Sequence, residues 1–295
     1  MAKIDKKNVY NFKNPYSPLR YPGGKAKLGP WLAELINYNK LTNLTYIEPY
    51  AGGAGAAFFL LFNKIVDRII INDADIAIYG IWHSILYETE KFIKTIKTTN
   101  LDIHTWKKQR DIIENHKQHT LFEIGFAAFF LNRTNVSGII KGGPIGGKDQ
   151  KGKYKLNARF KKDKLIYRIE NISKLRDKIR IYNKDAIALL HDIEKDFDKN
   201  KFIYLDPPYF KKGSQLYRNH YQIDDHTTIS KKVKELKLPW LITYDNCQEI
   251  KNLYKECKGL EFSLRYSTGQ KDRTIATELM YYGNINLHKP PSLIS

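Results

Sequence analysis

The residues best suited to chemistry are Asp206, Pro207, Pro208 and Tyr209, which directly follow the apolar run 202–205. Such a run predicts a central parallel strand, and open α/β sheets bind ligands at the carboxyl ends of their strands. Prolines fix the turn and lack N–H donors, so the Pro207 carbonyl and the Asp206 carboxylate can both accept hydrogen bonds from one amino group. With the Tyr209 ring as a stacking plate, this arrangement suits the exocyclic amine of a nucleobase held out of a duplex. The structural alternative is a rigid loop with a helix-capping aspartate, which the preceding strand disfavours.

A second candidate site is the glycine-rich turn 49–55, which lies between a predicted strand at 45–47 and a predicted helix at 55–63. The next predicted strand ends in Asp73, about 20 residues beyond the glycines. Strand, glycine turn, helix, strand and acid is the order of a nucleotide-binding α/β unit, in which the acid binds ribose hydroxyls. A dinucleotide oxidoreductase is the first rival, but Gly-Gly-Ala-Gly is not its glycine pattern, and that class leaves the Asp-Pro-Pro-Tyr segment unexplained.

The remaining pattern predicts an α/β sheet interrupted by a long insertion. Helical patterns cover residues 76–97 and 121–131, and strands alternate with helices again from Arg180 onward. The last two apolar segments, 261–268 and 276–283, predict an antiparallel hairpin at the sheet edge. We expect a discontinuous α/β domain formed by residues 15–85 and 180–285. Residues 86–179 should form an inserted domain, and residues 1–14 and 286–295 two tails.

The charge is strongly basic and unevenly distributed. The formal net charge is +19, and the segment 141–180 holds 14 lysines or arginines against four acidic residues, which places +10 of the total there. A basic excess attracts polyanions, so nucleic acid is the expected partner, with a solvated lysine-rich surface as the alternative. Five glycines between residues 142 and 152 predict a loop or hairpin that could follow a phosphate backbone.

The composition indicates a folded protein without a membrane segment. With 295 residues, of which 42% are hydrophobic, the chain can form one large domain or two modest ones. No stretch approaches the ~18 apolar residues of a membrane span, and residues 1–12 lack the apolar core of a signal peptide, so we expect a cytoplasmic protein. Cys247 and Cys257 form no metal-ligand spacing and no disulfide framework, and we expect both to be reduced.

Four motifs, in this order, resemble those of Dam-like (D12 class) DNA adenine-N6 methyltransferases. PLRYPGGK at 18–25 resembles the N-terminal cofactor motif, IEPYAGGAG at 47–55 the glycine motif, and LNRTNVSGI at 131–139 the start of the DNA-recognition region. DPPY at 206–209 resembles the catalytic motif. The similarity extends from about residue 15 to residue 283. It implies a Rossmann-like α/β methyltransferase sheet with an inserted, mostly helical DNA-recognition domain that carries a basic hairpin.

The resemblance implies S-adenosylmethionine as the cofactor, no metal, and a role for each matching residue. The catalytic residues would be Asp206, Pro207, Pro208 and Tyr209. Tyr21 stands where the family often has tryptophan. The implied cofactor-binding residues are Tyr21, Gly24, Lys25, Glu48, Pro49, Tyr50, Ala51, Gly52, Gly53, Gly55, Asp73 and Asp206, in which Asp73 would bind the ribose and Asp206 would lie between cofactor and target amine.

The implied partner is double-stranded DNA, bound by a monomer. Polar side chains suited to reading base edges are Asn132, Arg133, Asn135 and Ser137. Exposed cations suited to phosphates include Lys141, Lys153 and Arg159, with Lys148, Lys151 and Lys155 beside them. Tyr154 and Phe160 would either stack on bases or pack within the basic segment. The resemblance suggests GATC or a related short recognition site and leaves open whether a restriction endonuclease accompanies the enzyme.

The resemblance, together with the chemistry of these residues, implies direct methyl transfer. The lone pair of adenine N6 is delocalised into the ring until hydrogen bonds to Asp206 and the Pro207 carbonyl favour a pyramidal amine, which can then attack in line. The motif holds no cysteine, which argues against the thiolate chemistry of cytosine-C5 enzymes. Two alternatives stay open: a DNA-binding relative without activity, and an enzyme for cytosine N4 or an RNA base, although the aspartate favours adenine.

Overall fold

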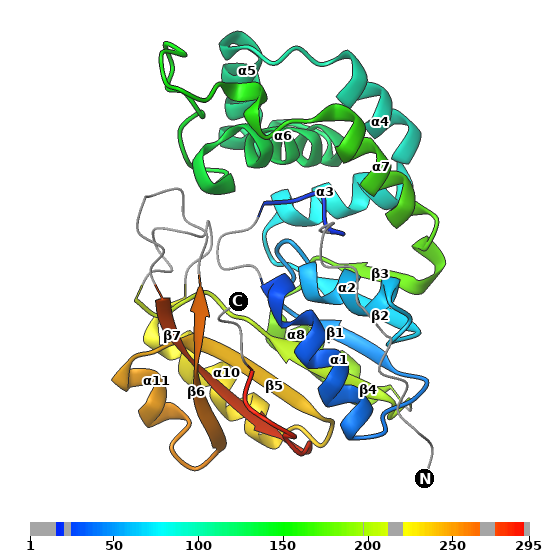
Figure 1. The fold of residues 1–295 in the computed structure, drawn as a ribbon, viewed down its shortest axis with the longest axis vertical. Coiled ribbons are helices and arrows are strands. Elements are labelled where there is room, and N and C mark those ends of the chain that lie inside the picture. The colour runs from blue at the N-terminus through cyan, green and yellow to red at the C-terminus, as the bar shows by residue number, and fades with distance from the viewer. Residues whose placement is uncertain (1–15, 21–24, 197, 212–220, 266–274, 292–295) are drawn as a thin grey trace.

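One mixed sheet of seven strands forms the lower half of the molecule in Figure 1, with the strand order β3-β2-β1-β4-β5-β7-β6. The computed structural model describes residues 16–20, 25–196, 198–211, 221–265 and 275–291. The strands are β1 (Thr45–Glu48), β2 (Arg68–Asn72), β3 (Ile179–Tyr182), β4 (Lys201–Leu205), β5 (Trp240–Asp245), β6 (Lys258–Arg265) and β7 (Ile275–Gly283).

The first five strands of this order are parallel, and β7 is antiparallel to both of its neighbours. The predicted pairing of the last two strands is confirmed. The sequence pattern did not show that β7 lies between β5 and β6, which leaves β6 as the edge strand. β1 and β4 are buried along their whole length, as expected for central strands of a parallel sheet covered on both faces.

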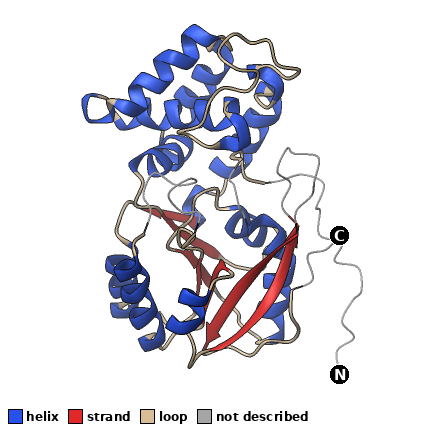
Figure 2. Ribbon diagram, turned by 90° about the vertical axis from the view of Figure 1, so that its left-hand side faces the viewer, coloured by secondary structure: helices blue, strands red, loops and turns tan. Residues whose placement is uncertain are grey.

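Helices cover both faces of the sheet (Figure 2). Alternate strand residues divide the core: Tyr46 and Tyr204 pack toward one side, and Ile47 and Ile203 toward the other. The first side is covered by α1 (Gly29–Tyr38) and α2 (Gly55–Phe62), whose core continues into α3 (Ile76–Tyr87). The second side is covered by α8 (Ala186–Lys195), α10 (Ile223–Glu235) and α11 (Gln248–Leu253).

The strand order reverses between β1 and β4, which pair in parallel with Ile47 opposite Ile203. The chain leaves these two strands in opposite directions, and doubly wound sheets bind ligands at the carboxyl ends of the strands at such a point. The glycine turn follows β1 and the Asp206–Tyr209 segment follows β4. Both candidate sites therefore meet at one edge of the sheet.

A helical layer lies above this edge in Figure 1, built from α4 (Thr89–Thr98), α5 (Ile103–Glu114), α6 (Leu121–Thr134) and α7 (Lys162–Ser173). A capping box between Thr120 and Glu123 starts α6, which is buried from Ile124 onward. α3 and α6 touch through two glycines: a Cβ added at Gly125 would lie 2.2 Å from the Gly80 carbonyl oxygen. The helical layer thus shares a continuous core with α3, at the predicted domain boundary.

The basic stretch between α6 and α7 is a loop of turns. Gly146, Gly147 and Gln150 have positive φ angles, and the described residues 141–159 form no strand. An isolated bridge joins Asn135 to Pro144, so the expected hairpin is an irregular loop. Short 3-10 helices are η1 (Lys25–Leu28), η2 (His116–Gln118), η3 (Val136–Gly138), η4 (Leu156–Ala158) and η5 (Arg176–Lys178). Across the described ranges, we find no helix long and apolar enough to cross a membrane.

Candidate active site

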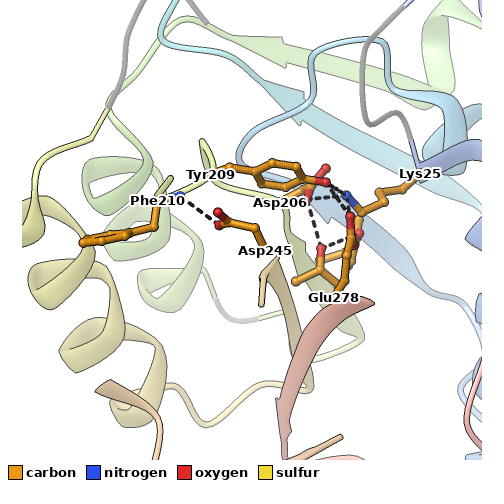
Figure 3. A network of polar contacts seen from close by, with 8 residues as sticks. Lys25, Asp206, Tyr209, Phe210, Asp245 and Glu278 are labelled. Carbon is orange, nitrogen blue, oxygen red and sulfur yellow. Dashed lines mark hydrogen bonds and ion pairs between the residues drawn. The ribbon is translucent and has the colours of Figure 1, made fainter. Parts of the chain in front are cut away.

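A buried polar network joins the Asp206 segment to the start of the first helices (Figure 3). The Lys25 ammonium lies 3.0 Å from Asp206 Oδ1 and 3.4 Å from Glu278 Oε2, and it donates to the Tyr209 hydroxyl at 2.9 Å. The Tyr209 hydroxyl in turn donates to Glu278 Oε1 at 2.5 Å. The Lys25 ammonium, from η1, therefore contacts side chains of the loop after β4 and of strand β7.

The charged groups of Lys25 and Glu278 are buried, and that of Asp206 is partly exposed. The side chains of Lys25 and Glu278 are 3% and 2% exposed, against 19% for Asp206. Burial alone would lower the pKa of Lys25, but the charges of Asp206 and Glu278 outweigh it and raise that pKa well above its usual value. Burial raises the pKa of Glu278, against the opposing charge of Lys25 and with the charge of Asp206. Lys25 is thus a permanent cation between two acids.

Asp206 is held through one of its two oxygens. Oδ1 contacts Lys25 and accepts a hydrogen bond from Thr243 Oγ1 at 3.0 Å, and Thr243 is itself paired with the Tyr204 hydroxyl at 2.8 Å. Within the described part of the chain, no hydrogen bond reaches Oδ2. A carboxylate anchored at one oxygen and partly exposed at the other can accept a hydrogen bond from a substrate amine.

The backbone after Tyr209 is fixed by Asp245, the last residue of β5. Its Oδ1 accepts the Phe210 N–H and its Oδ2 accepts the Lys211 N–H, both at 2.9 Å. The ring of Phe210 lies against His226 of α10, with 5.4 Å between ring centroids. The segment is therefore held at the Asp206 side chain, the Tyr209 hydroxyl and the following two amides.

The glycine turn is closed by two acids, the buried Glu48 and the half-buried Asp73. Glu48 Oε1 accepts the Ala57 N–H at 3.0 Å in the first turn of α2, and Asp73 Oδ2 accepts the Gly52 N–H at 3.0 Å. Burial raises the pKa of Glu48 to about 8, and that of Asp73 to about 7, although backbone hydrogen bonds oppose both shifts. Clustered acids with raised pKa values are typical of binding or catalytic sites.

The turn also packs closely on the N-terminal motif. A Cβ added at Gly55 would lie 2.8 Å from the Ala26 Cβ, so the turn needs glycine there. The Tyr50 hydroxyl pairs with that of Tyr221 at 2.9 Å. The structure thus brings together Lys25, Glu48–Gly55, Asp73 and Asp206–Tyr209, whereas Tyr21 and Gly24 lie outside the described residues.

Three of the four residues predicted to read base edges are buried inside the protein. Asn132, Arg133 and Asn135 are 1%, 9% and 0% exposed, and their polar groups bond to the protein itself. Asn132 accepts the Arg20 N–H at 2.9 Å and donates to the Arg20 and Gly138 carbonyls. These bonds satisfy the side chain, so this conformation leaves it no group with which to reach a base edge.

The other two buried residues hold the same turn. Asn135 accepts the Trp106 indole N–H at 2.7 Å and donates to the carbonyls of Ile139 and Ile140. Arg133 donates to the Arg159 and Pro18 carbonyls. Burial first, and then the neighbouring arginines, lower the pKa of Arg133 to about 9. Together they shape the backbone that presents residues 136–138.

The exposed part of this region is the turn tip and the basic loop. Ser137 is half-buried at a positive φ of 56°, beside Val136, which is 55% exposed. Lys141, Lys148, Lys151, Lys153, Lys155 and Arg159 are exposed, as phosphate contacts would require. Of the two aromatic residues, Phe160 packs in the core against Phe129 and Phe130, whereas Tyr154 is 62% exposed.

The sequence reasoning missed Asp245, Thr243 and Glu278. Glu278 left one signal, since it is the only charged residue in the apolar segment 276–283. A single acid in a strand that is otherwise apolar indicates either an edge position or a buried partner. Asp245 ends an apolar strand, the same position in which Asp73 and Asp206 drew attention.

The sheet order, with an antiparallel seventh strand inserted beside β5, is that of a Rossmann-like methyltransferase. The chain belongs to the D12 class N6 adenine-specific DNA methyltransferase family, whose model matches residues 21–268. It is therefore a methyltransferase specific for adenine in DNA, and the family implies S-adenosylmethionine as its cofactor.

Two curated relatives are type II methyltransferases, the enzyme type of restriction-modification systems. M.CviBI of Paramecium bursaria Chlorella virus NC1A is 22% identical over 84% of this chain and 90% of its own length. M.MjaIII of Methanocaldococcus jannaschii is 26% identical over 65% of this chain and 68% of its own. Among solved structures, one titled "crystal structure of a putative RNA methyltransferase PH1948 from Pyrococcus horikoshii" has a TM-score of 0.41 and 13% identity, covering 92% of this chain and 89% of that one.

Proposed function

We propose that the protein transfers a methyl group from S-adenosylmethionine directly to N6 of an adenine turned out of duplex DNA. The observation that carries this is Asp206: it is anchored at Oδ1, partly exposed, and without a hydrogen bond at Oδ2 from the described residues. Oδ2 and the Pro207 carbonyl would accept the two N6 hydrogens. Such bonds favour a pyramidal amine whose lone pair is available for attack.

The residues around the glycine turn fit the implied cofactor. A positively charged sulfonium suits a sheet edge that holds Glu48, Asp73 and Asp206, and the tight packing of Gly55 on Ala26 fixes the turn that would surround it. We propose that Pro49–Gly55 surround the methionine part and that Asp73 accepts the ribose hydroxyls. When bound, the sulfonium supplies an electrophilic methyl group with a good leaving group. The chain therefore needs only to position the two reactants and to stabilise the charge that develops.

Tyr209 would hold the extruded base. Its hydroxyl is tied to Lys25 and Glu278, which fixes the ring beside Asp206. A fixed ring is a better stacking plate than a mobile one, because less side-chain entropy is lost on binding. The exposed lysines of the basic loop would contact phosphates, and the turn tip at 136–138, held by buried Asn132 and Asn135, would face the bases.

The test compares wild type with Asp206→Ala on a duplex oligonucleotide, with nucleosides analysed by mass spectrometry after digestion. We expect N6-methyladenine from the wild type and none from the variant, while the two bind the duplex with similar affinity. Methylation by the Asp206→Ala protein would refute the assigned role, and methylcytosine as the product would refute the proposed substrate.

A further inference from the structure

The acid that completes the buried network comes from β7, far along the chain from the catalytic segment. Glu278 is 1% exposed as a residue, and the positions after it in the strand, Leu279 and Met280, are apolar core. Burying a carboxylate costs several kcal/mol unless its partners compensate. A carboxylate at this position therefore needs specific partners, and among the described residues these include Tyr209 and Lys25 of the proposed active site.

Each oxygen of Glu278 has its own partner. Oε1 accepts the Tyr209 hydroxyl at 2.5 Å, and Oε2 lies 3.4 Å from the Lys25 ammonium. One side chain thus holds the proposed stacking ring and the cation that anchors Asp206. Figure 3 shows these three side chains gathered on one side of the Asp206 segment.

The strand register adds a second observation. Glu278 of β7 stands directly opposite Asp245 of β5. Two like charges at opposed positions on neighbouring strands repel each other. Here each acid is occupied by the same segment, Asp245 by the Phe210 and Lys211 amides and Glu278 by the Tyr209 hydroxyl. The two acids grip consecutive residues of one loop.

The charges of Lys25, Asp206 and Glu278 together affect the chemistry of the site. With Asp206 alone, Lys25 would form a neutral pair and draw the carboxylate toward itself. With Glu278 ionised, the three groups carry a net charge of about −1, and the cation is shared between two acids. Sharing weakens the hold on Asp206 and leaves negative charge where the amine gains positive charge during transfer.

We propose that Glu278 is a positioning residue for methyl transfer, which fixes Tyr209 and Lys25 so that Asp206 presents Oδ2 to the target amine. This inference rests on the proposed function. Glu278 acts through its neighbours and does not contact substrate. Its loss should therefore lower kcat and leave binding of cofactor and DNA nearly unchanged.

The test is kinetic and uses Glu278→Gln in the full chain, with Glu261→Gln as the matched control. Glu261 is an exposed acid on neighbouring β6, bonded to Lys251 and distant in role from the site. We expect Glu278→Gln to lower kcat about tenfold or more, with KM for DNA and calorimetric affinity for S-adenosylmethionine within about threefold of wild type. The control should keep wild-type kcat.

A double-mutant cycle with Tyr209→Phe separates positioning from a general structural effect. If Glu278 acts through Tyr209, the double variant should lose less activity than the product of the two single losses. Independent, multiplying losses would overturn the inference, as would a Glu278→Gln enzyme with kcat within about twofold of wild type.

Two further outcomes are distinguishable. If Glu278→Gln does not fold, as judged by circular dichroism, Glu278→Asp keeps the charge and shortens the reach to Tyr209, and the same loss of kcat is expected from it. An Asp variant with wild-type kcat would overturn the inference. Failure of the proposed function would look different, because wild type and Glu261→Gln would then both transfer no methyl group.

Discussion

Lys25 offers a direct test of the buried network, because its removal by Lys25→Met keeps the volume and deletes the charge. The ammonium is 3% exposed and lies between Asp206 and Glu278. Without it, Glu278 remains buried and loses the Lys25 charge, whereas the 19% exposed Asp206 can be hydrated in part. Removing one partner of a buried pair costs about 3–5 kcal/mol, and we expect the lower end, about 3 kcal/mol, since one acid reaches water.

The assay is equilibrium unfolding at pH 7, followed by circular dichroism. A loss of about 3 kcal/mol should lower Tm by roughly 5 °C for a chain of 295 residues. In the Glu278→Gln background the same Lys25→Met change should cost about 1 kcal/mol, because the buried carboxylate that Lys25 compensates is gone. Lys231→Met, at an exposed position on α10, is the control and should lie within about 0.5 kcal/mol of wild type. A Lys25→Met cost below about 1 kcal/mol would refute the buried charge cluster.

Three further predictions concern the helical contact, the glycine turn and the basic loop. Gly125→Ala should destabilise by about 1–3 kcal/mol because its Cβ meets the Gly80 carbonyl, whereas Gly143→Ala, with open space around it, should not; equal unfolding midpoints would contradict the close contact. The pKa of Glu48 in the folded protein is raised to about 8, so the contribution of protonated Glu48 to folding stability is complete below about pH 4.5 and is lost as pH rises toward 8. Glu48→Gln should therefore gain stability relative to wild type between these pH values. Denaturant unfolding at a series of pH values measures this difference. Three exposed lysines of the basic loop can be neutralised together: Lys151, Lys153 and Lys155. Their loss should weaken binding to all duplexes and reduce the slope of log affinity against log salt concentration. An unchanged slope would show that the loop is only solvated and does not contact phosphates.

The sequence predicted the elements that carry the site, because their signals are local. An apolar strand followed by Asp206-Pro207, and a strand followed by glycines, each define a turn within a few residues. Parallel pairing then brings the two turns together at the switch point, which needs only the strand order. Hence Glu48, Asp73 and Asp206 all lie at the carboxyl edge of the sheet.

The parts that local signals could not predict depend on pairing between distant segments. Glu278 reaches Lys25 only because β7 inserts beside β5, and Asp245 meets the loop only through the β4–β5 register. The misplaced expectation for Asn132 and Asn135 has a similar origin. Polar residues at the end of an apolar helix suggest exposure, yet a tight turn needs buried donors and acceptors to satisfy its backbone.

The central claim is methyl transfer to adenine N6 with Asp206 at the reacting amine. The most direct measurement incubates plasmid DNA and S-adenosylmethionine with wild type or Asp206→Ala and reads modified bases by single-molecule sequencing. The account predicts N6-methyladenine confined to one short sequence with wild type, and unmodified DNA with the variant. Modified cytosine, or methylation that persists in Asp206→Ala, would contradict it.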